Sequence, residues 1–294
     1  MFGIDGELAV QLLVTGVSVG AVYGLIAVGF GLVFRASGLV NVLSGEFLVI
    51  GALVTGAASE SMPLVLAGMV GILVTMAAAE ISYDGFIRPV LKRADDHSAG
   101  VVVQMGLLLT IVAALQRQFG TAPRTIPPFS GYEPLNLFGA TVPRQTIWII
   151  AMLIAQVVAL RLLLFRTWPG MAMRATASNP VAAKLVGMSP QRVTRSVFLL
   201  AALVAALAGI VVAPATAVQF DSGLPYTLSG FIAAIMGGFG SITGALLGGI
   251  LLGEIQSFAS GSDYGRYRDV IVFGVLILVL IVRPGGLFSG RKQN

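Results

Sequence analysis

The sequence predicts an all-α membrane protein, a polytopic bundle of transmembrane helices. Of its 294 residues 56% are hydrophobic and 11% are charged, and the mean hydropathy is +0.93. A soluble domain carries roughly 25% charged residues, so this chain has too few polar groups to cover a surface in water. The apolar segments run almost from end to end, and residues 1–294 therefore form a single transmembrane domain without a separate soluble unit.

Segments long enough to cross a bilayer, about 20 apolar residues each, recur along the whole chain. They lie at 8–34, 37–58, 62–80, 98–116, 145–165, 196–214, 227–258 and 269–283. The segment at 227–258 is too long for one simple span, and Gly237-Gly238-Phe239-Gly240-Ser241 interrupts it. It is either two crossings or a re-entrant half followed by a span, so the chain crosses the membrane about eight or nine times.

The distribution of charge predicts the orientation. With the N-terminus outside and two crossings at 227–258, thirteen Lys and Arg face one side and five face the other. Adding the loop acids gives net charges of 13 − 4 = +9 and 5 − 7 = −2. Cytoplasmic loops carry the excess of Lys and Arg, so the N-terminus is predicted outside and the C-terminus inside. A single crossing would put the basic C-terminal tail outside, which favours the double crossing.

Two polar stretches are long enough to carry function. The outer one, 117–144, contains five prolines, which fix φ and remove backbone donors, and it predicts a stiff irregular loop. The inner one, 166–195, predicts helix. Asn179 can cap a helix that begins at Pro180, and Gly187 suits its end.

This short helix, about 180–186, is apolar along one side and is expected at the cytoplasmic surface. Its apolar residues are Val181, Ala182, Ala183 and Leu185, and Lys184 is its only charge. A helix of this kind fits a groove in another protein. The alternative is a plain connector between two spans.

Apart from Glu80 and Asp269, which are end residues of two spans and are counted with the loops, Glu46 and Glu254 are the only acids inside the predicted spans. Hydrocarbon cannot solvate a carboxylate, so each of these side chains must face protein or water or take up a proton. Each is therefore a candidate functional residue. The alternative is a hydrogen bond that only fixes helix packing.

Glycines recur at four-residue intervals in two places, beside each of the interrupted elements. The sets are Gly16, Gly20 and Gly24, and Gly240, Gly244 and Gly248. Faces without side chains let helix backbones approach closely. They suggest an internal repeat in which the Gly-broken segments of the two halves meet near the midplane, although glycine is also common in ordinary membrane-helix packing.

The residues that are missing exclude several classes of protein. There is no Cys and only one His, His97 in Asp95-Asp96-His97-Ser98, so no metal site is predicted. The eighteen Lys and Arg are scattered rather than gathered in a stripe, which argues against nucleic acid. No Gly-x-x-x-x-Gly-Lys-Ser/Thr loop and no embedded catalytic constellation occur, so an enzyme with its own ATPase site is not expected.

Three elements of the sequence, in matching order and spacing, resemble one family over nearly the whole chain. Asn41-Val42-Leu43-Ser44-Gly45-Glu46-Phe47 looks like an Asn-Phe-Ala-His-Gly-Glu-Phe element, with Ser44 where His is usual. The stretch from Gly237 to Ala245 is similar to Gly-Gly-x-Gly-Ser-x-x-Gly-Ala. The inner stretch resembles the coupling loop of ABC importer permeases of the LivH type, which serve branched-chain amino acids.

Within that loop Ala182, Ala183 and Gly187 match the Ala-Ala-x-x-x-Gly core, whereas Val181 departs from the acidic residue that opens it in many importers. The resemblance implies a permease subunit of the bacterial inner membrane with a cytoplasmic coupling loop at 166–195. It implies no cofactor on this chain, because ATP binds to partner subunits. The implied partners are two cytoplasmic ATPase subunits, a second LivH- or LivM-like permease, a periplasmic substrate-binding protein and the lipid bilayer.

The resemblance implies the coupling residues, and the broken helices suggest the residues of the substrate pathway. The residues expected to couple to the ATPase are Asn179, Val181, Ala182, Ala183, Lys184 and Gly187. The residues expected along the substrate pathway, where freed backbone groups meet the polar ends of an amino acid, are Asn41, Ser44, Glu46, Gly237, Gly238, Gly240 and Ser241. The alternative function is an ion-coupled secondary transporter or channel, with Glu46 and Glu254 as proton or cation sites.

Overall fold

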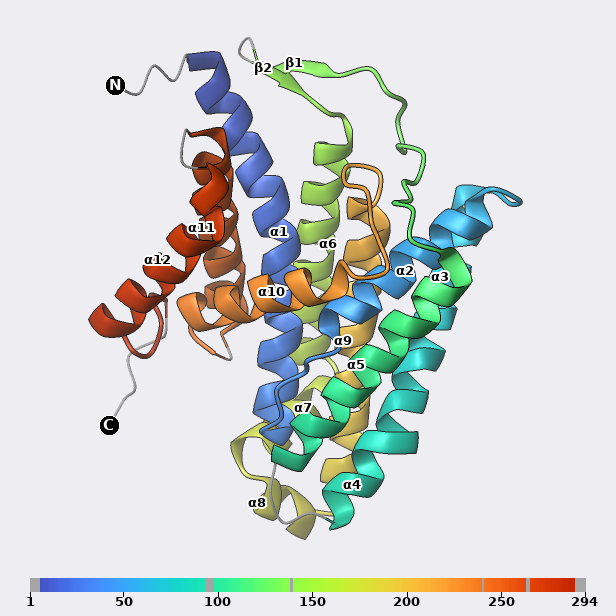
Figure 1. Cartoon of the computed structure of the whole chain (residues 1–294). Coiled ribbons are helices and arrows are strands. Elements are labelled where there is room, and N and C mark those ends of the chain that lie inside the picture. Colours follow the sequence, from blue (N-terminus) through green and yellow to red (C-terminus); the bar gives the residue numbers. More distant parts are fainter. Residues whose placement is uncertain (1–5, 94–97, 138–139, 240, 263–264, 289–294) are drawn as a thin grey trace.

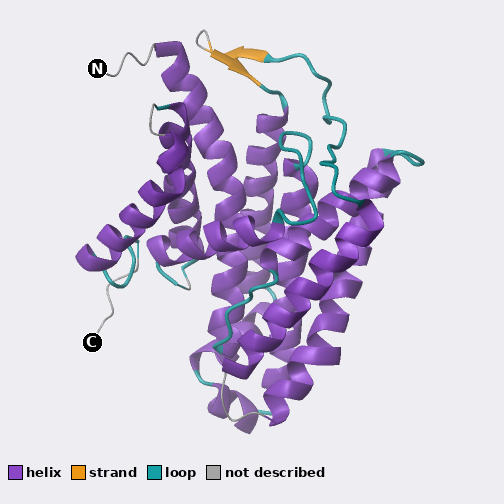
Figure 2. Ribbon diagram, in the orientation of Figure 1, coloured by secondary structure: helices purple, strands orange, loops and turns teal. Residues whose placement is uncertain are grey.

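The computed structural model describes residues 6–93, 98–137, 140–239, 241–262 and 265–288, and within these ranges it is almost entirely helical (Figures 1 and 2). The helices are α1 (Gly6–Ser37), α2 (Ser44–Ser59), α3 (Leu64–Glu80), the π-helix η1 (Ile81–Ile87), α4 (Arg88–Arg93), α5 (Ser98–Phe119), α6 (Gln145–Arg166), α7 (Trp168–Ser178), α8 (Pro180–Leu185), α9 (Pro190–Val212), α10 (Gly223–Gly237), α11 (Ile242–Gly261), the 3-10 turn η2 (Gly265–Tyr267) and α12 (Arg268–Val282). His97 and Gly240 lie outside the described residues.

The predicted all-α membrane architecture is confirmed. In the part of the chain that the structure describes, six helical segments are long and apolar enough to cross a membrane. They are α1, the continuous stretch Leu64–Arg93, α5, α6, α9 and α11. Large apolar side chains stay exposed on the outer helices, among them Val65, Leu109, Ile154 and Ile281. An apolar outer surface of this kind is stable against lipid rather than water.

α1 is the central helix of the bundle and packs against α9, α10 and α11 (Figure 1). It approaches α11 most closely, because glycines of both helices face each other. A Cβ atom on Gly20 would lie 2.6 Å from the Cα of Ile250, and Gly249 and Gly253 lie against the backbone of Gly24 and Gly20. The predicted glycine face of α1 is therefore a real packing surface.

The predicted close approach at the second glycine set is confirmed for Gly244 and Gly248, and the neighbour there is α10. Gly244 lies against Gly237, and Gly248 lies against Ala233 and Gly237. α11 thus has two faces without side chains, one for each neighbour. The four-residue spacing identified a close contact correctly, but spacing along one helix does not specify which neighbour lies on each face.

α2, with 16 residues, and α10, with 15, are short apolar helices that begin inside the molecule. The expected helix at 37–58 starts only at Ser44, because 38–43 is non-helical and Gly38 has a positive φ of 72°. α10 lies across the direction of α1 in Figure 1. The expected broken segment at 227–258 is two helices, α10 and α11, and α10 begins earlier than predicted, at Gly223.

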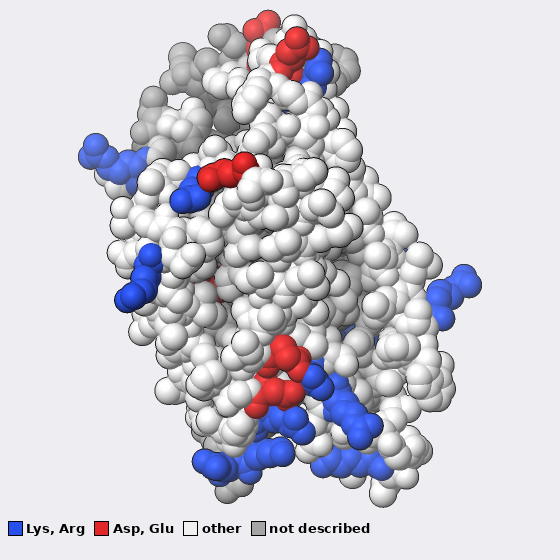
Figure 3. Space-filling view, turned by 90° about the vertical axis from the view of Figure 1, so that its right-hand side faces the viewer, with Lys and Arg blue, Asp and Glu red and all other residues white. Residues whose placement is uncertain are grey.

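The two ends of the molecule differ in composition. We call the end with α4, α7, α8 and the last turn of α1 the α8 end, and Figure 3 shows Lys and Arg gathered at its level. At the opposite end, the loop at 120–144 contains a short antiparallel hairpin, β1 (Leu135–Leu137) and β2 (Ala140–Val142), which the sequence did not predict (Figure 2). This loop is fastened by an ion pair between Arg124 and Glu60, 3.4 Å apart.

Candidate functional site

The interrupted element at 41–46 packs against the start of α10 in the middle of the bundle. The backbone N–H of Gly45 donates to Thr227 Oγ1 at 2.9 Å, and that hydroxyl donates to the carbonyl of Val42 at 3.3 Å. Gly45 approaches Gly223 so closely that a side chain on Gly45 would collide with its carbonyl. We call residues 41–46 together with Gly223 and Thr227 the interior site.

The non-helical backbone of the interior site is held by polar side chains from neighbouring segments. Gln104 of α5 accepts from Val42 N at 2.9 Å through Oε1 and donates to the carbonyl of Val40 at 2.9 Å through Nε2. Asn41 Oδ1 accepts from Leu43 N at 3.3 Å, and Ser44 Oγ donates to the carbonyl of Asn41 at 3.1 Å. Irregular backbone at membrane depth requires such partners, since lipid offers none.

Glu46 is the unusual member of the interior site. Its side chain is 0% exposed, and neither carboxylate oxygen has a hydrogen-bond partner among the described residues. Gly223 makes room for it, because a Cβ at Gly223 would collide with this carboxyl group. Asn41 Nδ2 also lacks a partner within the described chain. A buried acid and a buried amide donor without partners are groups available to a polar ligand.

A second row of polar side chains lies beside the interior site. Tyr23 of α1 donates to Gln256 of α11 at 2.8 Å, and its ring centroid lies 6.2 Å from that of Tyr226. The Tyr226 hydroxyl lies 3.4 Å from Thr216 Oγ1. The sequence reading missed these residues, although Gln104 and Gln256 carried a usable signal as polar side chains within apolar spans.

The second Gly-rich element does not meet the first, which corrects the predicted midplane pairing. Tyr226, near the start of α10, stacks beside Tyr23, whereas Phe239 stacks on Phe34 with ring centroids 5.0 Å apart. Eleven residues separate these two positions on α1, which corresponds to about 16 Å at 1.5 Å per residue. The element at 237–241 therefore lies toward the α8 end rather than at the interior site.

Its residues form the joint between α10 and α11. Gly237 packs against Gly244, and Gly238 has a positive φ of 98° and lies against Gly286. Ser241 caps α11, accepting from the N–H of Gly244 at 3.0 Å. This geometry accounts for Gly237, Gly238 and Ser241 as structural residues.

Glu254 lies elsewhere again, in the interface between α1 and α11. A Cβ on Gly16 would meet its carboxyl oxygen at 2.6 Å, and Oε2 has no hydrogen-bond partner in the described ranges. Gly16 is seven residues from Tyr23 on α1, in the direction away from the α8 end. The two candidate acids therefore lie at different depths and do not form one site.

The short helix predicted at 180–186 is present as α8. Asn179 Oδ1 accepts from Val181 N at 3.0 Å and from Ala182 N at 2.9 Å, and Gly187 has a positive φ of 82°. Ala183 is buried, while Val181, Ala182, Lys184 and Leu185 are exposed, Leu185 by 84%. α8 thus presents apolar side chains outward, and α7 and α9 are the described helices that pack against it most.

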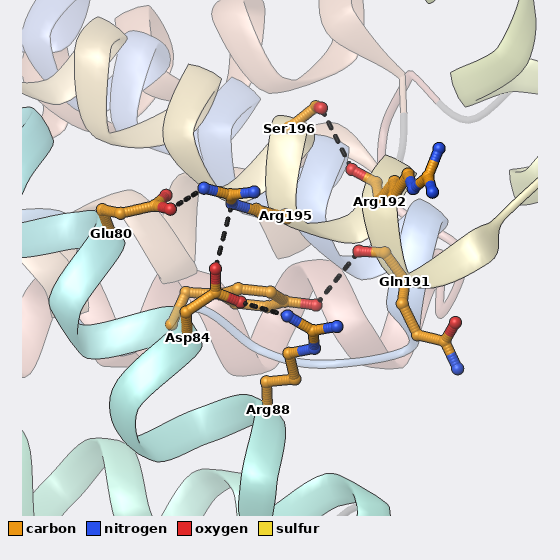
Figure 4. A network of polar contacts seen from close by, with 8 residues as sticks. Glu80, Asp84, Arg88, Gln191, Arg192, Arg195 and Ser196 are labelled. Atoms are coloured by element: carbon orange, nitrogen blue, oxygen red, sulfur yellow. Dashed lines mark hydrogen bonds and ion pairs between the residues drawn. The ribbon is translucent and has the colours of Figure 1, made fainter.

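An ion-pair network links the helix that follows α8 to the π-helix η1 (Figure 4). Arg195 of α9 pairs with Glu80 and, at 3.2 Å, with Asp84, which also pairs with Arg88 at 2.9 Å. The Tyr83 hydroxyl donates to the carbonyl of Gln191 at 3.5 Å. A displacement of α8 would reach α9 directly and η1 through these contacts.

Comparison with known proteins gives one consistent family. The model of a family described as "Branched-chain amino acid transport system / permease component" matches residues 12–280. The chain is 30% identical to the permease protein LivH of Salmonella typhimurium, with 96% of each chain covered, and 29% identical to the permease protein BraD of Pseudomonas aeruginosa, again with 96% of each chain covered. Both relatives are described as parts of a high-affinity branched-chain amino acid transport system.

Two more distant similarities complete the comparison. The permease protein LivM of Escherichia coli is 27% identical, over 93% of this chain and 69% of its own length. A chain in the solved structure of PsaBC from Streptococcus pneumoniae in complex with Fab matches with a TM-score of 0.51 and 12% identity, over 96% of this chain and 93% of that one. At this identity the structural likeness concerns the fold alone.

Proposed function

The chain belongs to the family of permease components of branched-chain amino acid transport systems, and from this membership we propose that it is the membrane-spanning subunit of an ABC importer. It carries branched-chain or related amino acids into the cytoplasm, using ATP that partner subunits hydrolyse. The whole chain forms one permease domain. It holds no cofactor and has no ATPase site of its own.

In this proposal the chain crosses the inner membrane nine times. The N-terminus lies in the periplasm, and the C-terminus and the coupling loop at 166–195 lie in the cytoplasm. The charge distribution supports this orientation. The half-length helices α2 and α10 are two of the nine passes, each completed by the non-helical segment that precedes it.

The amino acid passes through the interior site. Glu46 receives its ammonium group, because a buried carboxylate without partners can form a charge-assisted hydrogen bond there. Asn41 and Ser44 lie on the same backbone segment and would face the polar end of the substrate. Gly237, Gly238 and Ser241 serve the pathway as its inner joint rather than as substrate ligands beside Glu46.

The observation that carries the coupling role is α8, a capped helix that projects apolar side chains at the α8 end of the molecule. We assign it to a groove of an ATPase subunit. Asn179 and Gly187 fix its two ends, and the exposed Val181, Ala182, Lys184 and Leu185 form the contact, with Ala183 anchoring it to the permease. Closure of the ATPases displaces α8, and the Arg195 network transmits this displacement to η1.

The partners are two cytoplasmic ATPase subunits, a second permease of the LivH or LivM kind and a periplasmic substrate-binding protein that docks near the loop at 117–144. Copurification from native membranes tests this assembly, with Leu185→Asp as the variant. The charge should remove the ATPase subunits and retain the sister permease. Tyr132→Asp, which changes an equally exposed side chain in the outer loop, should retain both, and loss of the ATPase in neither variant would contradict the assignment of α8.

The unpartnered Glu46 also favours a second candidate function, an ion-coupled secondary transporter. Collapse of the membrane potential while cellular ATP stays high separates the two. Uptake by an ABC importer should continue, whereas an ion-coupled transporter should stop at once.

A further inference from the structure

A cavity of about 340 Å³ lies at the α8 end of α1, away from the interior site. Its floor is one face of α1, formed by Val28, Gly31, Leu32 and Arg35, at the i, i+3, i+4 and i+7 spacing of neighbours on a helix. The ends of α6 and α7 and the first turn of α11 form its walls. Ser241 of the joint between α10 and α11 lines it, but none of its described lining residues belongs to the interior site.

One end of the cavity is strongly cationic. Arg35 and Arg174 both line it, and neither forms an ion pair with any described residue. Arg174 lies over the Phe165 ring, 4.8 Å from its centroid, and Phe165 also lines the cavity. None of the described lining residues is acidic. The N-terminus of the 20-residue α11, capped by Ser241, adds the positive end of a helix dipole.

The remaining lining is mainly apolar. Val28, Leu32, Leu164, Val197 and Ile242 belong to it, and from Arg35 to Val28 the α1 face runs about 10 Å at 1.5 Å per residue. A soluble anion would leave this apolar lining unused, and an apolar peptide would leave two arginines without partners. The combination of two arginines with an apolar lining matches an amphiphile with one anionic head.

A second, larger cavity of about 700 Å³ continues the cationic end. It shares Arg35, Ala36 and Ala177 with the first and adds Arg88 and Lys92 to the lining. The buried hydroxyl of Thr176, which has no hydrogen-bond partner within the described ranges, also lines it. A head group anchored at Arg35 therefore has polar space beside it for further hydroxyl or phosphate oxygens.

We propose that this pair of cavities binds one anionic phospholipid, with its phosphate between Arg35 and Arg174 and an acyl chain along Val28 and Leu32. Basic pockets between membrane helices are suited to such head groups. The lipid would fill the groove between α6 and α11 and connect the joint of α10 and α11 to α7, which leads into α8. The inference depends on the chain lying in a membrane and not on which solute it carries.

Native mass spectrometry of the purified full-length protein, with the subunits that accompany it, tests the proposal. The probes are phosphatidylglycerol and phosphatidylcholine with the same acyl chains. The wild type should retain phosphatidylglycerol at least fivefold better, the Arg35→Gln/Arg174→Gln variant should lose this preference, and Arg35→Lys/Arg174→Lys should keep most of it. Arg166→Gln, which removes a cation at the same end but outside the cavity, should behave as wild type.

Equal retention of both lipids by the wild type would overturn the proposal, and so would an unchanged preference for phosphatidylglycerol in the double Gln variant. Displacement of phosphatidylglycerol by millimolar inorganic phosphate would also overturn it, because that result would indicate a site for a soluble anion. A second measurement covers the case in which the double Gln variant does not fold. Leu32→Trp, in a Trp148→Phe/Trp168→Phe background, should be quenched more strongly by brominated phosphatidylglycerol than by brominated phosphatidylcholine. Equal quenching would count against the lipid.

Discussion

The cap of α8 allows a sharp test of the coupling role. Asn179 Oδ1 accepts two backbone N–H groups at the start of a helix of only six residues. Helices this short are not stable by propensity alone, so α8 depends on its cap and its neighbours. Replacement of an Asn cap by Ala costs about 1 kcal/mol, which corresponds to about a fivefold change in the equilibrium between the folded and frayed helix.

Asn179→Ala should therefore lower the maximal rate of ATP-dependent uptake by up to about fivefold. The KM for the amino acid should stay unchanged, because the interior site is not touched. Amide hydrogen exchange of Val181 and Ala182 should accelerate by the same factor, since these are the two N–H groups that lose their acceptor. The assay is initial-rate uptake of radiolabelled amino acid into proteoliposomes or cells, with exchange followed by mass spectrometry.

The chain supplies matched controls. Asp caps helices as well as Asn does, so Asn179→Asp should restore both uptake and protection from exchange. Ser189 also occupies a cap position, before α9, but its side chain makes no capping hydrogen bond, so Ser189→Ala should have little effect. If Asn179→Asp were as inactive as Asn179→Ala, the amide itself would be required and the capping argument would be refuted.

Further predictions concern the core and the charges. Glu46→Gln should reduce uptake tenfold or more, because a hydrogen bond to a charged group contributes about 1.5–3 kcal/mol. Glu60→Gln at the outer surface should leave uptake unchanged. Equal uptake in both variants would show that Glu46 is not part of the substrate pathway. Gly20→Ala would force a Cβ to within 2.6 Å of the Ile250 Cα and should lower the thermal unfolding midpoint, whereas Gly68→Ala, with nothing within 4 Å, should not lower it. Arg195→Gln should lower the free energy of unfolding by no more than about 1 kcal/mol, because the ion pairs of Arg195 are partly exposed. This loss of stability should become smaller in 1 M salt. A larger loss that does not depend on salt would indicate that Arg195 stabilises the protein by packing.

The features that the sequence predicted most accurately are those that depend on residues close together in the chain. The cap at Asn179, the helix end at Gly187 and the break before Ser241 depend on residues within a few positions, and all three are present. The burial of Glu46 followed from the apolar residues around it. Six apolar segments of membrane-spanning length were also found among the described residues, because hydrophobic length is a property of the local chain.

Long-range pairing could not be predicted in the same way. Thr227 and Gly45 are 182 positions apart, and the local sequence around either residue does not indicate that the two form a hydrogen bond. The Gly-broken elements were expected to meet because both are interrupted, but the depth of an interruption depends on where its helix begins. α10 begins at Gly223 rather than at Thr227, beside Glu46, and the residue Phe239 just beyond its far end packs against Phe34, eleven residues along α1 from Tyr23.

The contact between α1 and α11 has a consequence for the transport cycle. At Gly20 and Gly24 the two backbones touch over successive turns, and at Gly16 the Glu254 side chain lies against the α1 backbone. Such an interface has no flexible layer to deform, so sliding or tilting of one helix against the other would produce immediate steric collision. We therefore expect these two helices to act as a rigid spine, and alternating access to be achieved by rotation of the segments around it.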